Sequence, residues 1–236
     1  MKIRLLPKSV KNRLKQVADP EKVVLLSRFF KTGKGEYGEG DKFLGIVVPV
    51  QRSIARKYVE LDLKQIGELL RDKYHEVRLT GFLILVYKVE SLAKVSKSIV
   101  DLYLSNLDYV NNWDLVDLTA PRILGKYLFD EGKSRKILYK LAKSKDIWRR
   151  RIAIISTLYF ISKNDFQDTV ALSEILMKDQ HDLIHKAVGW MLREVGKRDE
   201  KTLISFLRKY AQKMPRIMFR YSIERLKKDK LEMIVS

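Results

Sequence analysis

The sequence predicts an all-α fold, and three observations lead to this prediction. Apolar residues recur at spacings of three and four along most of the 236 residues, which is the period of an amphipathic helix. Only 11 Gly and 5 Pro are present, and seven of the Gly precede residue 90, so most of the chain lacks the turn residues that an all-β fold needs. Hydrophobic residues make up 46% of the chain, as is normal for a protein with its own core.

The N-terminal third is expected to begin with a capped helix and to continue into a loop. Asp19 is a candidate N-cap, and Pro20 and Glu21 suit the first turn that follows it. The apolar face of this helix consists of Val23, Val24, Leu26, Phe29 and Phe30, and the helix is expected to stop near Thr32. Residues 31–45 contain five Gly and many charges, which predicts a loop, and Pro49 restarts the helix.

The rest of the chain is expected to be a series of helices joined by short turns. They are predicted near residues 113–129, 134–143, 147–162, 166–177, 183–197, 201–212 and 214–228. Helix pairs that repeat at about 35 to 45 residues are typical of an α-solenoid superhelix of HEAT-like repeats, here as a single domain over residues 1–236. Such a superhelix offers a concave groove, which basic helices are expected to line. An irregular helical bundle is the alternative.

The charge of the chain indicates a polyanionic partner. Lys and Arg number 48 against 29 Asp and Glu, a formal net charge of +19, and a field of this sign attracts nucleic acid. Basic residues gather in residues 1–15, without an acid, and in residues 133–151 and 206–230, which hold nine basic residues each against one and two acids. A generally basic surface without a specific partner is the alternative.

Other classes of protein are excluded or disfavoured by missing features. The chain has no Cys, which rules out disulfides and thiolate metal sites, and its apolar runs are far shorter than the roughly 18 residues of a membrane span. A cytoplasmic protein without membrane contact is expected. His181 and His185 lie four apart but lack a third ligand, so no metal site is expected. No phosphate-binding loop or serine-nucleophile motif is present, and no cofactor is expected.

One pair of residues has the properties of a reactive site. Trp113 and Asp117 lie four apart and therefore share one side of a helix, whereas Asp114 falls on another side. A carboxylate beside a Trp ring is partly desolvated unless it meets a cation or a ligand. The alternative is an Asp that is bonded to the N-terminus of a neighbouring helix.

Two further segments combine cations with aromatic residues. Arg149, Arg150 and Arg151 point in directions roughly 100° apart on one helix, and Arg151 begins the apolar stripe of that helix. An Arg in such a place needs a carboxylate or a phosphate. Trp190 lies off the apolar stripe of its helix, on the side that carries Lys186, Arg193 and Lys197. This side is a nucleic-acid surface, or the Trp caps a boundary between repeats or packs under Arg193 as a cation–π pair.

Three blocks of the sequence resemble the AlkD-like DNA alkylation repair family, HEAT-like-repeat glycosylases that remove alkylated purines from DNA. They are FFKTGKGEYGEGDKFLGI at residues 29–46, NNWDLVDLTAPRILG at residues 111–125, and DIWRRRIAI at residues 146–154 with HKAVGWMLREVGK at residues 185–197. The resemblance places the catalytic carboxylate on Asp117, the cleft tryptophans on Trp113 and Trp190, and the cleft arginine on Arg151. It places the family's cleft tyrosine on Phe29, which keeps the ring and loses the hydroxyl.

The resemblance implies a monomeric, monofunctional DNA glycosylase of base excision repair, which acts without a cofactor on N3- and N7-alkylated purines in duplex DNA. Contacts to DNA are expected from Phe29, Arg149, Arg150, Lys186, Arg193 and Lys197. The protein is expected in the cytoplasm, at the nucleoid when bound to DNA, without an obligate protein partner. Two alternatives are a non-catalytic HEAT-repeat protein that binds distorted or branched DNA, and a helical scaffold that binds acidic proteins.

Overall fold

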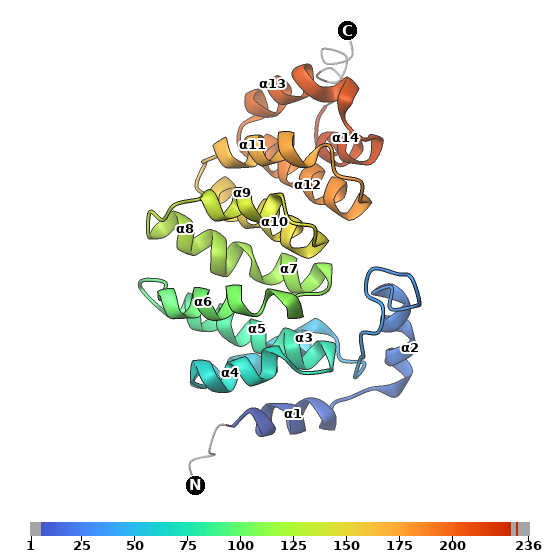
Figure 1. The fold of residues 1–236 in the computed structure, drawn as a ribbon, viewed down its shortest axis with the longest axis vertical. Helices are drawn as coiled ribbons and strands as arrows, with labels where there is room; N and C mark the ends of the chain where they lie inside the picture. The colour runs from blue at the N-terminus through green and yellow to red at the C-terminus, as the bar shows by residue number, and fades with distance from the viewer. Residues whose placement is uncertain (1–5, 228–229, 231–236) are drawn as a thin grey trace. The chain divides into compact units, whose positions relative to one another are not determined.

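The computed structural model describes residues 6–227 and residue 230, and its described residues form the predicted all-α fold (Figure 1). By contacts the chain forms two compact units, Met1–Ile123 and Leu124–Ser236, called unit 1 and unit 2 below. The single domain over residues 1–236 and the solenoid superhelix with a basic groove stay predictions. Lys2, Arg4 and Lys228, three cations of the basic segments, lie outside the described residues.

Unit 1 is built around one long buried helix. Its helices are α1 (Pro7–Gln16), α2 (Pro20–Phe29), α3 (Val48–Arg56), α4 (Leu63–Leu70), α5 (His75–Glu90), α6 (Lys97–Ser105) and α7 (Trp113–Thr119), with a 3-10 turn at Leu107–Tyr109. A π-helical segment, Pro121–Gly125, follows α7. Helices α3 and α4 pack on α5, which is buried on nearly all sides. The described part of unit 1 has one isolated β-bridge, between Lys42 and Tyr74.

Unit 2 consists of successive pairs of neighbouring helices, as expected for helical repeats (Figure 1). They are α8 (Lys126–Asp130), α9 (Lys136–Ala142), α10 (Ile147–Ser162), α11 (Gln167–Leu176), α12 (Asp182–Arg198), α13 (Glu200–Tyr210) and α14 (Arg216–Ile223), with a 3-10 turn at Ala211–Lys213. Its core lies between α10 and α12, which α9, α11 and α14 flank. Gly189 allows α14 to approach α12 closely, because a Cβ there would lie 2.5 Å from the Met218 carbonyl oxygen.

Helix α2 begins as predicted, but its apolar face is not buried as expected. Its start is as predicted, with Asp19 accepting hydrogen bonds from the backbone N–H groups of Glu21 and Lys22. Its apolar face, however, is not a core face: Val24 is 57% exposed and Phe29 59%, and no residue within α2 is buried. Only Phe30, just after the helix, is buried, and within α2 itself Leu26 and Phe29 line a cavity of unit 1.

Among residues 6–227 and 230, no helix is both long and apolar enough to cross a membrane.

Candidate active site

The start of α7 is held in place by Asn112, which is fully buried. Its side-chain Oδ1 accepts a hydrogen bond of 2.9 Å from the backbone N–H of Trp113, and its Nδ2 donates 3.1 Å to the Phe30 carbonyl oxygen. One amide therefore caps α7 and ties it to the end of α2. This bond orients the first turn of α7, from which Trp113 projects, and Asp117 follows one turn later on the same side.

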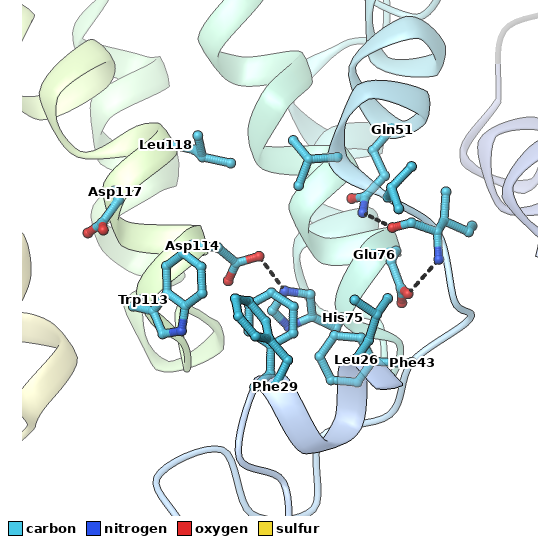
Figure 2. A pocket seen from close by; sticks show the side chains of 14 residues that line it. Leu26, Phe29, Phe43, Gln51, His75, Glu76, Trp113, Asp114, Asp117 and Leu118 are labelled. Carbon is cyan, nitrogen blue, oxygen red and sulfur yellow. Dashed lines mark hydrogen bonds and ion pairs between the residues drawn. The ribbon is translucent and has the colours of Figure 1, made fainter. Parts of the chain in front are cut away.

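A cavity of about 340 Å³ lies beside this turn, and Phe29, Trp113 and Asp117 line it together (Figure 2). Its walls come from α2, α3, α5, α7 and residues 43–47. The Phe29 and Trp113 rings meet edge to face, with centroids 5.6 Å apart. The structure thus brings three of the predicted site residues to one place within unit 1.

The two carboxylates of α7 point in different directions (Figure 2). Asp117 is half-buried, and its carboxylate is directed outward on the side of Trp113. Asp114 is 3% exposed and turns toward His75 on α5. The sequence prediction that Trp113 and Asp117 share a side of the helix, with Asp114 on another side, is therefore confirmed.

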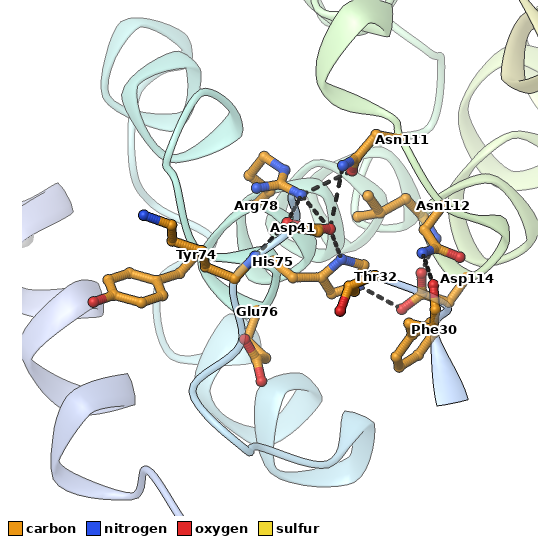
Figure 3. A network of polar contacts seen from close by, with 12 residues as sticks. Phe30, Thr32, Asp41, Tyr74, His75, Glu76, Arg78, Asn111, Asn112 and Asp114 are labelled. Atoms are coloured by element: carbon orange, nitrogen blue, oxygen red, sulfur yellow. Dashed lines mark hydrogen bonds and ion pairs between the residues drawn. The ribbon is translucent and has the colours of Figure 1, made fainter. Parts of the chain in front are cut away.

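Behind the cavity wall, a buried network of charges joins three segments of unit 1 (Figure 3). The His75 ring donates 2.8 Å from Nδ1 to Asp41 and 2.8 Å from Nε2 to Asp114. Arg78 donates to both carboxylate oxygens of Asp41, at 2.8 and 2.9 Å, and 2.8 Å to Asn111. The network links the Gly-rich loop, the first turn of α5 and the first turn of α7.

This arrangement keeps His75 charged. Burial would lower the pKa of His75, but the charges and hydrogen bonds of Asp114 and Asp41 outweigh burial and raise that pKa to about 9. Burial would likewise raise the pKa of Asp41, but His75 and Arg78 hold it below its usual value. Two cations and two carboxylates therefore face one another in the interior, where each needs its partners.

Residues 31–45 are an irregular loop, as predicted, and the structure shows what holds it. Besides Asp41, the loop is bound by Glu76, whose carboxylate accepts three backbone N–H bonds, from Leu44, Gly45 and Ile46, at 2.9, 2.9 and 3.1 Å. Gly45 has a φ of +84°, and a Cβ there would overlap the Asp19 carbonyl oxygen. The loop is thus held by specific contacts, and its Phe43 lines the cavity.

In unit 2, the three consecutive arginines have three different surroundings. Arg149 has a side chain that is 36% exposed and lies 3.9 Å from Asp146. Arg150 donates 2.6 and 3.3 Å to the two oxygens of Asp179 and also bonds the carbonyls of Ser144 and Lys145. Arg151 is 5% exposed and donates 2.5 Å to the Leu183 carbonyl oxygen. Arg150 and Arg151 therefore hold α10 to the start of α12.

Trp190 lies half-buried on α12 in a cluster that centres on Glu194. The indole Nε1 donates 3.1 Å to Glu194, and Lys197 donates 2.7 and 2.9 Å to the same carboxylate. Arg193 donates 3.4 Å to Glu194 and also pairs with Glu224, the residue just after α14. Among the cation–π pairs of the described residues, Arg193 does not lie over the Trp190 ring, so the cation–π pair is wrong, and the Trp at a repeat boundary stays an alternative.

His181 and His185 form hydrogen bonds at the start of α12. His181 accepts a hydrogen bond from the Leu183 backbone N–H, and the His185 Nε2 lies 2.7 Å from the Asp179 carbonyl oxygen. Over the described part of the chain, no group of three or more His, Asp or Glu side chains is arranged to hold a metal ion.

The predicted site residues therefore form two sets. Phe29, Trp113 and Asp117 belong to unit 1, and the second set belongs to unit 2, namely Arg149, Arg150, Arg151, Lys186, Trp190, Arg193 and Lys197. Sequence reasoning missed Asp41, His75 and Arg78. The only signal for them was the group of ionisable residues at positions 75, 76 and 78, at the start of a strongly apolar helix. It also missed Glu194 and the buried Gln51 on the cavity wall.

Several solved structures resemble this chain. A predicted DNA alkylation repair enzyme from Enterococcus faecalis matches with a TM-score of 0.74 at 17% identity, over 89% of this chain and 97% of that one. AlkD2 from Streptococcus mutans matches with a TM-score of 0.57 at 14% identity, over 92% and 99%. The protein smu.31 from Streptococcus mutans UA159 matches with a TM-score of 0.55 at 16% identity, over 91% and 100%. These likenesses support the fold.

No curated protein matches the chain. The family model described as "DNA alkylation repair enzyme" matches residues 10–226, which is nearly the whole sequence and includes both units. The chain therefore belongs to the DNA alkylation repair enzyme family.

Proposed function

We propose that this chain is a monofunctional DNA glycosylase, which hydrolyses the N-glycosidic bond of N3- and N7-alkylated purines in duplex DNA. The observation that carries the proposal is the half-buried carboxylate of Asp117, directed outward beside the Trp113 ring. Membership of a DNA repair enzyme family and the net charge of +19 support DNA as the partner.

The chemistry of the substrate explains why one carboxylate suffices. A purine alkylated at N3 or N7 is cationic, so when the C1′–N bond breaks, both electrons pass to the ring and the base leaves neutral. No general acid is needed to protonate the base. The deoxyribose becomes oxocarbenium-like, and a fixed negative charge stabilises that transition state. Water then bonds to C1′ and loses a proton, for which the Asp117 carboxylate is an acceptor.

The surrounding residues keep Asp117 and Trp113 in a fixed position. Asn112 caps their helix, and Asp114 joins its first turn to His75. Preorganisation of this kind matters because an electrostatic catalyst works only if its charge does not have to reorient during the reaction. In this proposal the Trp113 and Phe29 rings pack on the sugar and backbone near the lesion.

Unit 2 supplies further DNA contacts in this proposal. Lys197 is exposed, the Arg149 side chain is 36% exposed, and the half-buried Trp190 offers an aromatic face. Arg151 is assigned to a backbone phosphate, a contact that would compete with its bond to the Leu183 carbonyl, because the side chain is 5% exposed. Lys186 and Arg193 are further cations of unit 2 assigned to DNA. A phosphate contact by Arg150 would compete with its ion pair to Asp179. The protein acts in base excision repair, in the cytoplasm and on the nucleoid.

The test compares release of 3-methyladenine and 7-methylguanine from methylated duplex DNA by wild type, Asp117→Asn and Asp101→Asn. Asp101 is an exposed carboxylate of α6 that pairs with Lys97 and serves as the matched control. We expect Asp117→Asn to release base about 100-fold or more slowly than wild type and to keep the DNA affinity of wild type. Asp101→Asn should keep both the rate and the affinity of wild type. A wild type that binds DNA in a salt-dependent manner but releases no base would refute the proposal and indicate a non-catalytic DNA-binding protein.

A further inference from the structure

The side of α12 that is predicted to contact DNA carries an acid of its own. Glu194 is the one acidic residue within residues 186–197. Its Oε1 accepts 3.1 Å from the Trp190 indole and 2.7 Å from Lys197, which also reaches Oε2 at 2.9 Å. Arg193 donates 3.4 Å to the same Oε1. Three of the four residues that the sequence assigns to this side are therefore bound to one carboxylate in the DNA-free chain.

The donors around Glu194 are of the kinds that also bind a phosphate. A DNA phosphodiester, like a carboxylate, spreads one negative charge over two oxygens, and indole, ammonium and guanidinium N–H groups donate to either. Trp190 and Lys197 reach the carboxylate from the turns before and after it. Arg193 is tied on its other side to Glu224, which holds it in place if the Glu194 carboxylate moves away. The three donors therefore form a site for one anionic group with two oxygens.

The contacts of Glu194 are open to exchange because they lie at the surface. The Lys197 side chain is 43% exposed, and those of Glu194 and Arg193 are 19% exposed. An ion pair that water reaches adds little stability, so breaking it is easy. A phosphate that replaces the carboxylate restores the hydrogen bonds, and the release of counter-ions from DNA favours the exchange. A carboxylate that stays beside the DNA repels the phosphates instead. Glu194 therefore lowers DNA affinity, whether it stays or is displaced.

We propose that Glu194 occupies the place of a DNA backbone phosphate in the DNA-free chain, and that the phosphate displaces its carboxylate from Lys197 and the Trp190 indole when DNA binds. The inference rests on the proposed function for DNA as the partner, and it adds a residue that limits affinity for DNA. Such a limit helps the chain to leave undamaged duplex, which a repair enzyme meets far more often than a lesion. If Glu194 only orients Trp190, its charge is irrelevant and its acceptor oxygen suffices.

Glu194→Gln separates the charge from the acceptor, since Gln keeps an oxygen for the Trp190 indole. Binding of the full chain to a short undamaged duplex is measured by fluorescence anisotropy at about 0.15 M salt, where distant charges are screened. Glu194→Gln should bind about two- to fivefold more tightly than wild type. Its salt slope should be steeper by about 0.9, the value for one further phosphate neutralised.

Asp182→Asn is the matched control, because it also removes one negative charge from α12, at a side chain that is 73% exposed. It should leave DNA affinity unchanged. Equal or weaker binding by Glu194→Gln, or the same gain in Asp182→Asn, would overturn the proposal.

A double-mutant cycle with Lys197→Met tests whether Glu194 acts on the assigned donor. Met keeps the apolar stem and lacks the ammonium. In this background Glu194→Gln should gain almost no affinity, because the cation for which the carboxylate and the phosphate compete is absent. The same gain in both backgrounds would mean that Glu194 acts only through its charge at a distance, and the exchange would be refuted.

A measurement on wild type needs no substitution at Glu194. The indole N–H resonance of Trp190, assigned by its loss in Trp190→Phe, is followed by NMR while the undamaged duplex is added. It should shift, because the acceptor changes from a carboxylate to a phosphate. An unchanged resonance in the DNA-bound chain would contradict the exchange.

The outcomes separate this inference from the proposed function. If wild type releases alkylated bases from DNA but Glu194→Gln binds undamaged duplex no more tightly, the inference is wrong and the glycosylase proposal stands. If Glu194→Gln binds more tightly in the Lys197-dependent manner but wild type releases no base, the phosphate site stands and the glycosylase proposal is wrong.

Discussion

His75 makes the stability of unit 1 depend on pH in a direction that the structure predicts. Burial alone would lower its pKa, but Asp114 and Asp41 raise it from 6.5 to about 9. A group whose pKa is higher in the folded state stabilises that state fully below its unfolded pKa, and the stabilisation is lost as pH rises through the folded pKa. We therefore expect the contribution of His75 to the stability of unit 1 to be complete below about pH 6.5 and to be lost steadily toward pH 9.

The size of the effect follows from the two pKa values. One pKa unit corresponds to about 1.4 kcal/mol, so the rise from 6.5 to about 9 corresponds to about 3 kcal/mol of unfolding free energy. This is a large part of the roughly 5 to 15 kcal/mol that stabilises a typical domain. Loss of the His75 charge leaves Asp41 and Asp114 facing one fewer cation in the interior, which is the physical cause of the weakening.

The assay is native-state hydrogen exchange of the buried α5 amides between pH 6 and 10, after correction for the intrinsic exchange rate. His75→Gln is the reference, because it lacks the titrating ring and keeps every other ionisable group of the chain. An NMR titration of the His75 ring gives its pKa directly, and Asp114→Asn should lower that pKa. A wild-type pKa at or below 6.5, or the same pH dependence in wild type and His75→Gln, would refute the reasoning.

Three further predictions concern packing, DNA contact and an ion pair in unit 2. Gly189→Ala should lower the free energy of unfolding by about 1 to 3 kcal/mol, because the new Cβ would lie 2.5 Å from the Met218 carbonyl oxygen. Gly67→Ala is the control: the nearest contact of its Cβ is 3.5 Å, so it should be neutral or stabilising. Urea unfolding of both variants measures the two free energies. Arg149→Ala should lower DNA affinity and reduce the salt slope of binding by about 0.9 without changing stability. Arg150→Ala should instead destabilise the chain by about 1 to 3 kcal/mol, because it leaves the Asp179 carboxylate unpaired in the interior, and an unchanged unfolding midpoint would contradict this.

The helices were predictable because their periodicity is local. The segment expected at residues 147–162 is the observed α10, Ile147–Ser162, and its preceding Asp146 caps it as a side-chain acceptor. The one misjudged surface is α2, where apolar spacing indicated a helix face but gave no information on whether anything covers it. Hydrophobic periodicity predicts which residues share a face, and burial depends on neighbours that are remote in sequence.

The candidate site was predictable in part for the same reason. Trp113 and Asp117 lie four residues apart, so helix geometry alone places them together. The residues that hold them are remote in sequence: His75 bonds Asp114 across 39 positions, and Asn112 bonds Phe30 across 82. No spacing rule reports such contacts. Gln51 could not be singled out from the sequence either, because only the folded chain shows that its Oε1 lacks a partner among the described residues.

The central claim is that Asp117 stabilises positive charge that develops as a cationic base leaves. Two duplexes that differ only in lesion charge test it most directly: one contains 7-methylguanine, which is cationic in DNA, and the other contains 7-methyl-7-deazaguanine, its neutral analogue of the same shape. The account predicts that wild type releases the base from the first duplex alone, and that Asp117→Asn releases it from neither. Equal release from both duplexes, or release from the first that survives Asp117→Asn, would contradict the account.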